Sequence, residues 1–161
     1  IIAKNYKSAK VFGKLFRDRE IEKIYFAICQ GIPRNLNSIV KLGINKKKSN
    51  KNLQTITKYK VVNKSNKISL ILYKPLTGKT HQLRIVSKYL NCPIVGDAKY
   101  GNNKNHSKEQ LMLNAFYLQF TFKNQQYEFR SILPKNIIKF MKRVNLVIPK
   151  SEKIENLSKT F

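Results

Sequence analysis

The sequence predicts an α+β fold. Strand-like segments rich in β-branched and aromatic residues form pairs separated by short turns, and helical patterns lie apart from them. A doubly wound sheet needs a regular alternation of strands and helices, which this sequence does not have. The chain has 161 residues and a 42% hydrophobic composition, enough for a domain with a core. We expect one domain over residues 1–148 and a poorly ordered polar tail over 149–161.

The first predicted element is an amphipathic helix over residues 6–19. Its apolar side chains recur at helical spacing with Lys and Arg between them; they are Ala9, Phe12, Leu15 and Phe16. Residues 24–29 predict a strand because β-branched and aromatic residues dominate there, and a Gly and a Pro follow. Residues 34–54 are polar and rich in Lys and Asn, and predict a loop with one short strand over 38–42.

A hairpin and a second helix follow. Residues 55–62 and 67–73 predict two strands, joined by a four-residue turn over 63–66. After a punctuating Pro, Thr and Gly, residues 80–90 return to a helical pattern, which Pro93 ends.

A second hairpin and a last helix complete the predicted domain. Residues 111–122 and 127–131 predict two strands with a turn at residues 124–125. Residues 134–144 predict a helix, because a Pro stands in the first turn and apolar residues recur at helical spacing after it.

The chain is strongly basic. It has 33 Lys and Arg against 8 Asp and Glu, a formal charge of +25, which attracts polyanions such as nucleic acids. The basic residues are 27 Lys and only 6 Arg, beside 17 Asn and 18 Ile. Because Lys, Asn and Ile all have A/T-rich codons, drift accounts for part of the Lys excess, but not for the scarcity of acids. No apolar run approaches the roughly 20 residues that span a bilayer, so no membrane partner is expected.

Several catalytic motifs are incomplete. Gly78-Lys79-Thr80 resembles the end of a phosphate-binding loop, but the first Gly of that motif would fall on Tyr73. The two His and two Cys have no metal-ligand spacing, and no nucleophile-elbow motif is present. With only two Asp, Asp18 and Asp97, paired carboxylates are not expected either.

The most distinctive segment is residues 75–84, Pro-Leu-Thr-Gly-Lys-Thr-His-Gln-Leu-Arg. It combines a turn, two cations, two hydroxyls, an imidazole and an amide at a strand-to-helix junction. Such groups suit contacts with phosphates and base edges. An ordinary helix start capped by Thr80, with Arg84 in solvent, would use the same residues. The residue types alone leave both interpretations open.

This segment closely resembles the P-x-T-G-R-T-H-Q-[IL]-R motif of the RluA/RluC/RluD-type pseudouridine synthases, enzymes that act on RNA of the large ribosomal subunit. Other stretches match motifs of that family in the expected order, so the similarity covers about residues 1–145. These stretches are residues 2–5, 23–27 with Gly31, 93–97 with 99–101, and 111–115 with Phe120.

The resemblance implies a cytoplasmic isomerase without cofactor or metal that converts uridine to pseudouridine in RNA, most often large-subunit ribosomal RNA. It also implies a mixed, largely antiparallel sheet flanked by helices. Tyr25 matches the active-site tyrosine that packs on the target base. Arg84 matches the arginine that pairs with the catalytic aspartate and helps to hold the base flipped out. The RNA-binding residues expected from the motif are Lys79, Thr80, His81 and Gln82.

The sequence also departs from the family pattern. The family nucleophile lies in an H-R-L-D-x-x-T-S-G motif just upstream of an A-K-N segment, which residues 3–5 resemble. We therefore expect the catalytic aspartate to be absent from these 161 residues and the chain alone to be inactive. Neither Asp18 nor Asp97 has the flanking residues of the nucleophile, and Asp97 matches a turn where a structural role is expected. Lys79 replaces an Arg, which loses bidentate geometry, and Val86 and Asn114 stand where many members have His.

An alternative interpretation is a catalytically inactive RNA-binding remnant of a split or decaying gene. In that case the charge and residues 75–84 would serve only as a binding surface. Because binding to RNA falls with salt in either case, affinity alone does not separate the two interpretations.

Overall fold

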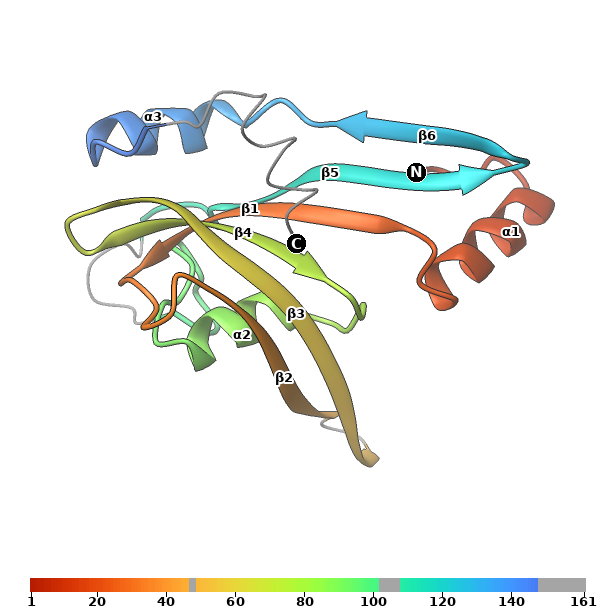
Figure 1. The fold of residues 1–161 in the computed structure, drawn as a ribbon, viewed down its shortest axis with the longest axis horizontal. Helices are drawn as coiled ribbons and strands as arrows, with labels where there is room; N and C mark the ends of the chain where they lie inside the picture. Colours follow the sequence, from red (N-terminus) through yellow and green to blue (C-terminus); the bar gives the residue numbers. More distant parts are fainter. Residues whose placement is uncertain (47–48, 102–107, 148–161) are drawn as a thin grey trace.

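The computed structural model describes residues 1–46, 49–101 and 108–147 (Figure 1). Within these residues six strands form one sheet in the order β2-β3-β4-β1-β5-β6, accompanied by three helices. Every strand pair described is antiparallel, and the α+β class is confirmed. Along the chain the elements are α1 (Tyr6–Arg17), β1 (Glu22–Gln30), β2 (Asn37–Lys46), β3 (Ser49–Ser65), β4 (Ile68–Pro75), α2 (Gln82–Tyr89), β5 (Leu113–Phe122), β6 (Gln125–Arg130) and α3 (Lys135–Arg143).

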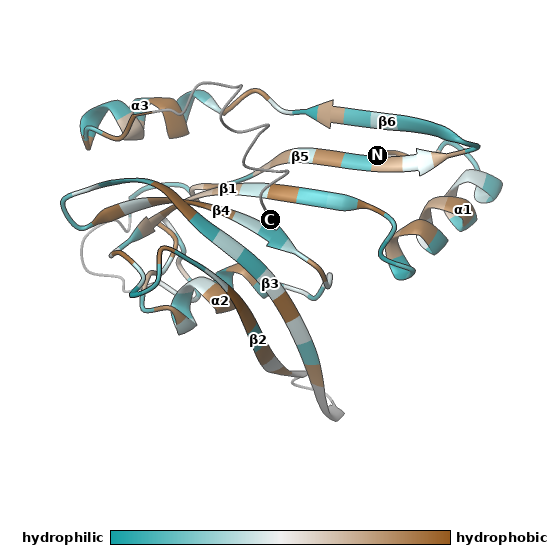
Figure 2. Ribbon diagram, viewed as in Figure 1, coloured by the Kyte–Doolittle hydropathy of each residue, from teal (hydrophilic) through white to brown (hydrophobic). Residues whose placement is uncertain are grey.

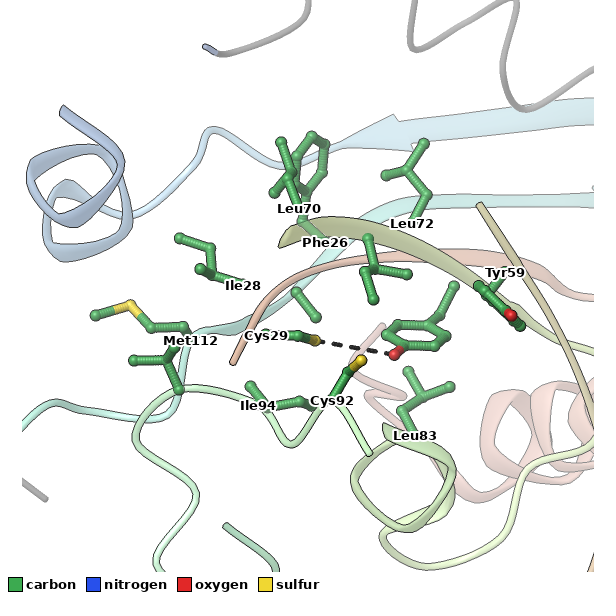
Figure 3. Packing of buried hydrophobic residues seen from close by; sticks show 14 of the residues in the cluster. Phe26, Ile28, Cys29, Tyr59, Leu70, Leu72, Leu83, Cys92, Ile94 and Met112 are labelled. Carbon is green, nitrogen blue, oxygen red and sulfur yellow. Dashed lines mark hydrogen bonds between the residues drawn. The ribbon is translucent and has the colours of Figure 1, made fainter. Parts of the chain in front are cut away.

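The core lies around β1 and β4, the two central strands. Phe26, Leu70 and Leu72 lie on one side of the sheet, and Cys29, Leu83 and Cys92 lie on the other (Figure 3). Both faces of these strands are covered, which explains why β4 is an almost continuous apolar run. Burial raises the pKa of the Cys29 thiol to about 12, so this cysteine acts as a small apolar core residue.

The helices are positioned by their apolar faces. In α1, the Asn5 side chain accepts a hydrogen bond from the Ser8 N–H at 2.9 Å, and Phe12 packs edge-on against Phe120 of β5 at 5.4 Å. Helix α2 lies against β2, β3 and β4 (Figure 1). Helix α3 buries Ile137 and Phe140 in the main core. Strand β6 is mostly hydrophilic, as expected for an exposed edge (Figure 2).

Residues 34–54 were predicted as a loop with one short strand over 38–42; that strand is confirmed as part of β2, but the loop around it was wrong, because β2 and β3 include most of this segment. Strands β2 and β3 form a long hairpin that starts with Asn37 opposite Lys60 and reaches Asn45 opposite Asn52. Backbone pairing in a hairpin at the edge of a sheet does not require apolar side chains on both faces, so a Lys- and Asn-rich segment can form it. The missed signal is the alternation of Val40, Leu42 and Ile44, which is typical of a half-buried strand.

Three smaller boundaries also differ from the prediction. The β3–β4 turn contains only residues 66–67, because Ser65 already pairs with Ile68, and Asn66 has φ +50°. The β5–β6 turn contains residues 123–124, both with positive φ. Helix α2 starts at Gln82, two residues after the predicted start.

The remaining predictions about domain organisation fall on residues that the structure does not describe. The predicted tail at 149–161, and with it the domain boundary at 148, lies outside the described residues, as does part of the loop after Gly101. Among the residues described, no helix is long and apolar enough to cross a membrane.

Candidate active site

A pocket of about 330 Å³ lies where β1, the end of β4 and the start of α2 meet. Tyr25 and Arg84 both line it, so the two residues expected to be catalytic come together from distant parts of the sequence. Lys79, His81 and Gln82 line it as well, whereas Thr80 lines a neighbouring groove. The other lining residues are Lys23, Pro75, Thr77, Gly78, Leu83, Leu111 and Leu113.

The turn before α2 is held by Gln82. This side chain is only 4% exposed, and its Oε1 accepts hydrogen bonds from the Thr77 hydroxyl at 2.9 Å and from the Lys79 N–H at 3.1 Å. Its Nε2 donates to the Thr57 hydroxyl at 2.9 Å. The amide thus ties the turn to β3 from inside the protein.

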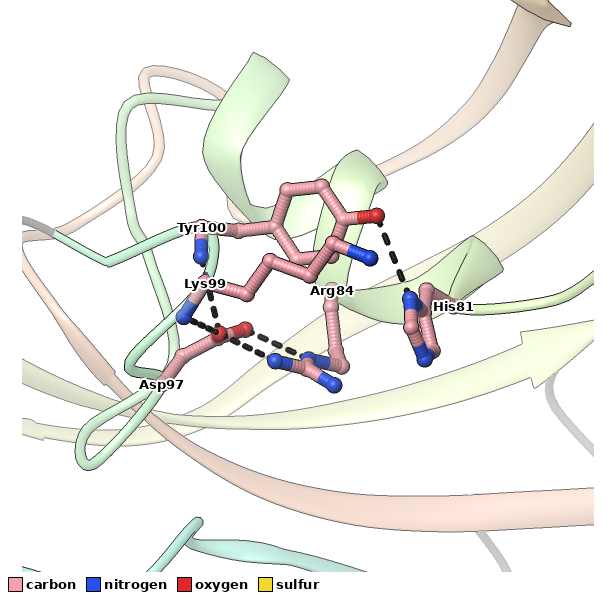
Figure 4. Close-up of polar contacts among 5 residues, drawn as sticks. All are labelled: His81, Arg84, Asp97, Lys99 and Tyr100. Atoms are coloured by element: carbon pink, nitrogen blue, oxygen red, sulfur yellow. Dashed lines mark hydrogen bonds and ion pairs between the residues drawn. The ribbon is translucent and has the colours of Figure 1, made fainter. Parts of the chain in front are cut away.

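His81 stands at the start of α2 in the left-handed region, with φ +57°, and its side chain makes no capping hydrogen bond. Its Nδ1 lies 3.2 Å from the Tyr100 hydroxyl, and the two rings meet edge-on with centroids 5.6 Å apart (Figure 4). The backbone conformation and the Tyr100 contact together orient the imidazole at the rim of the pocket.

Arg84 forms a bidentate ion pair with Asp97. Its Nε donates to Oδ2 at 2.8 Å and its Nη2 donates to Oδ1 at 2.6 Å (Figure 4). The guanidinium also lies over the Tyr100 ring, 5.1 Å from the centroid. The pair therefore fixes both the position and the plane of the guanidinium.

Asp97 is itself held by the backbone. Its Oδ1 accepts hydrogen bonds from the N–H groups of Lys99 at 3.0 Å and Tyr100 at 2.9 Å, and its side chain is fully buried. Burial by itself would raise the pKa of this carboxyl, but the hydrogen bonds from Arg84 and the two N–H groups outweigh it and lower the pKa. Donation of these hydrogen bonds to Asp97 in turn raises the pKa of Arg84, so both groups remain charged.

The turn that carries Asp97 is packed against the start of β5. Gly96 has φ +75°, and a Cβ at this position would coincide with the backbone carbonyl of Gln110. The Met112 N–H donates to the Val95 carbonyl at 2.9 Å just beside it. Asp97 is therefore placed by a turn that only Gly can form here.

Tyr25 projects from β1 at a point where the register with β5 shifts, between Ile24 and Tyr25. It pairs with Tyr73 of β4 on one side and with Ala115 of β5 on the other. Burial raises the pKa of the Tyr25 phenol and lowers that of the Lys23 ammonium nearby on the strand. The phenol is thus protonated at neutral pH.

Comparison with known proteins identifies the group to which this site belongs. Residues 1–89, more than half of the chain, match the RNA pseudouridylate synthase family. The chain belongs to this family. Two relatives in the RluA-type group, the ribosomal large subunit pseudouridine synthase D of Borreliella burgdorferi and synthase C of Rickettsia typhi, are 33% and 36% identical to this chain. The resemblance that the motifs indicated is confirmed.

The alignments cover most of this chain but less of each relative. They include 88% of the chain and 47% of the Borreliella protein, and 85% and 46% for the Rickettsia protein. The chain thus spans about half the length of the curated relatives it matches. The structure of human RNA Pseudouridylate Synthase Domain Containing 1 shares the fold, with a TM-score of 0.79 at 21% identity over 99% of this chain and 74% of that one.

One contact at the site was not predicted from the sequence. Arg84 was expected to face a catalytic aspartate, and Asp97 to have a structural role in its turn; the structure joins the two directly. The signal was available, because Asp97 is one of only two Asp in the chain and the Gly before it indicates a tight turn. The sequence does not show that this turn lies next to α2 in the fold.

Proposed function

We propose that this chain supplies the uridine-binding side of an active site that converts uridine to pseudouridine in large-subunit ribosomal RNA, in the cytoplasm. The observation that carries the proposal is the pocket shared by Tyr25 and Arg84, which match the active-site tyrosine and arginine of the family. The names of the relatives, ribosomal large subunit synthases, support the choice of RNA.

In this proposal the target uridine leaves the RNA stack and enters the pocket of about 330 Å³. The Tyr25 ring packs on the base, and its protonated phenol can exchange a proton with the base as the glycosidic bond is broken and re-formed through C5. Leu111 and Leu113 provide an apolar wall for the base.

Lys79 and His81 lie at the basic rim of the pocket, where we assign them to the phosphates and edges of the flanking nucleotides. Thr80 is exposed beside them and is assigned to the same contacts. Gln82 has a different role in the proposal. Because it is buried and bonded to Thr77 and Thr57, it acts on RNA only by ordering the turn that carries Lys79.

Arg84 has N–H donors that the pair with Asp97 does not use and that can bind a reacting group. Asp97 occupies its Nε and Nη2, so the Nη1 group is not part of that pair. A guanidinium has five N–H donors in a fixed fork, and its second edge can bind another carboxylate. We propose that Arg84 bridges Asp97 and the nucleophilic aspartate, with Asp97 as its positioning residue.

Neither aspartate of this chain suits the role of nucleophile. Asp97 is buried in its pair with Arg84, and Asp18 is the C-cap of α1 and does not line the pocket. We therefore propose that the nucleophile comes from outside these 161 residues, on a segment with the H-R-L-D-x-x-T-S-G motif. The chain alone is then inactive.

Detection of pseudouridine by carbodiimide modification and primer extension tests the proposal on a large-subunit ribosomal RNA transcript. The purified chain alone should give no product, and the chain together with a polypeptide carrying the H-R-L-D-x-x-T-S-G motif should give product. Product from the chain alone would refute the external nucleophile. RNA binding without product in the combined reaction would favour the inactive RNA-binding remnant.

A further inference from the structure

A second, larger hollow adjoins the candidate active site. It has a volume of about 1010 Å³ and lies between the β2–β3 hairpin and the start of α2. We call it the hairpin groove. It shares Gly78, Lys79 and His81 with the Tyr25–Arg84 pocket, so the two hollows meet at the turn before α2. A polymer with one unit bound in the pocket can therefore extend into the groove.

The charge of the hairpin groove has one sign. Lys79, Lys88 and Lys99 line it, and no Asp or Glu is among its lining residues. The three lysines come from three segments: the turn, the last part of α2 and the loop after Asp97. All three are exposed, and none forms an ion pair within the part of the chain that the structure describes.

The walls of the groove suit a nucleic acid strand better than a small anion. Ile44 of β2 and Leu53 of β3 add apolar groups to the lining, and the Tyr100 hydroxyl lies 3.2 Å from Nδ1 of His81, which lines both the groove and the pocket. A groove of about 1010 Å³ lined by both cations and apolar groups fits a nucleic acid strand, which offers phosphates to the cations and sugars and bases to the apolar groups. Three separated lysines also match a row of phosphates rather than a single one.

We propose that the hairpin groove binds the backbone of the single RNA strand next to the target uridine. Lys79, Lys88 and Lys99 contact successive phosphates, and the β2–β3 hairpin keeps the strand against α2. This inference rests on the proposed function, because it takes RNA as the ligand. It assigns a binding role to Lys88, to Lys99 and to the hairpin, none of which the sequence motifs indicated.

The test measures binding of a fluorescein-labelled oligouridine to the whole chain by fluorescence anisotropy, over a series of salt concentrations. The variant carries Lys88→Gln and Lys99→Gln, which leave Lys79 and the active-site pocket unchanged. The matched control carries Lys135→Gln and Lys142→Gln, two exposed lysines of α3 that line neither hollow. Both variants lose the same charge, and thermal unfolding followed by circular dichroism verifies that both are folded.

The groove variant should bind about tenfold more weakly, and its slope of log affinity against log salt should decrease by roughly 0.7 for each lysine removed. The control should retain nearly the parental slope. Equal slopes in the two variants, with binding retained, would overturn the groove and leave the proposed function standing. No binding by the parental chain would instead contradict the proposed function itself.

Discussion

The two hollows that meet at the turn before α2 hold their cations in opposite ways. In the pocket, Arg84 is bound through two hydrogen bonds to a buried carboxylate, and only 18% of its side chain is exposed. In the hairpin groove, Lys79, Lys88 and Lys99 are exposed and take no part in the ion pairs described. A group that must meet a reacting atom needs one fixed geometry, whereas a phosphate needs only a charge within reach. Under the proposed function, stability and RNA binding therefore depend on different cations.

The largest expected effect is on stability, from Asp97→Ala. This change leaves the Arg84 guanidinium without its buried partner, so the free energy of unfolding should fall by about 3 kcal/mol. Urea unfolding followed by circular dichroism measures it. The control is Glu109→Gln, which breaks the exposed pair with Arg143 and should cost less than about 0.5 kcal/mol. Equal losses in the two variants would contradict the comparison.

Next in size is Gln82→Ala. The buried hydroxyls of Thr57 and Thr77 each lose a hydrogen bond, so the free energy of unfolding should fall by about 2 kcal/mol. Affinity for oligouridine should also fall, since Lys79 is no longer held in place. Thr80→Ala, at an exposed position in the same turn, serves as the control and should change stability by less than about 0.5 kcal/mol. A stable Gln82→Ala protein would show that the turn is held by other contacts.

A pair of reciprocal substitutions sharpens the contrast further. Arg84→Lys keeps the charge but loses the bidentate geometry, which should cost about 1.5 kcal/mol of stability. Lys79→Arg, at a proposed phosphate contact, should change stability by less than about 0.5 kcal/mol and keep the salt dependence of RNA binding. A larger loss of stability from Lys79→Arg than from Arg84→Lys would contradict the assignment of Arg84 as the cation held in one geometry.

The smallest expected effect is a dependence of stability on pH. The pKa of Asp97 is lower in the folded chain than in the unfolded chain, so its contribution is fully present above the unfolded value, near pH 4. It is lost as the pH falls through the folded value. Urea unfolding of the parental chain and of Asp97→Asn should therefore give stabilities that converge below about pH 4. A difference that widens on acidification would contradict this sign.

Much of the site was predictable because it depends on contiguous residues. The strand carrying Tyr25 and the helix carrying Arg84 both followed from local patterns, and the family motif indicated their roles. The Arg84–Asp97 pair was not predictable from spacing, because it depends on how the turn at 96–97 packs against residues 109–110, just before β5. The burial of Gln82 was missed for the same reason, since its partner Thr57 lies on a strand far along the sequence.

The fold shows the same division between local and distant causes. Apolar strands such as β1 and β4 were predicted correctly, because burial on both faces leaves a continuous apolar run. Strands over 38–42 and 55–62 were predicted, but the full length of the β2–β3 hairpin was missed. Lys and Asn obscure the alternation of Val40, Leu42 and Ile44, and the two strands are held together mainly by pairing of their backbones. The hairpin groove, whose one wall is this hairpin, was therefore not predictable either.

The pocket and the hairpin groove differ in how well they tolerate substitutions, because the pocket depends on Gly96. A lysine of the hairpin groove can be exchanged for another cation, or gained and lost at a neighbouring exposed position, at little cost to folding. Position 96 accepts no side chain at all, because any Cβ would coincide with the Gln110 carbonyl and displace the turn that carries Asp97. A neutral mutational process can thus redistribute the charge that we propose holds RNA, while a single methyl group at position 96 would disturb the turn that orients Arg84.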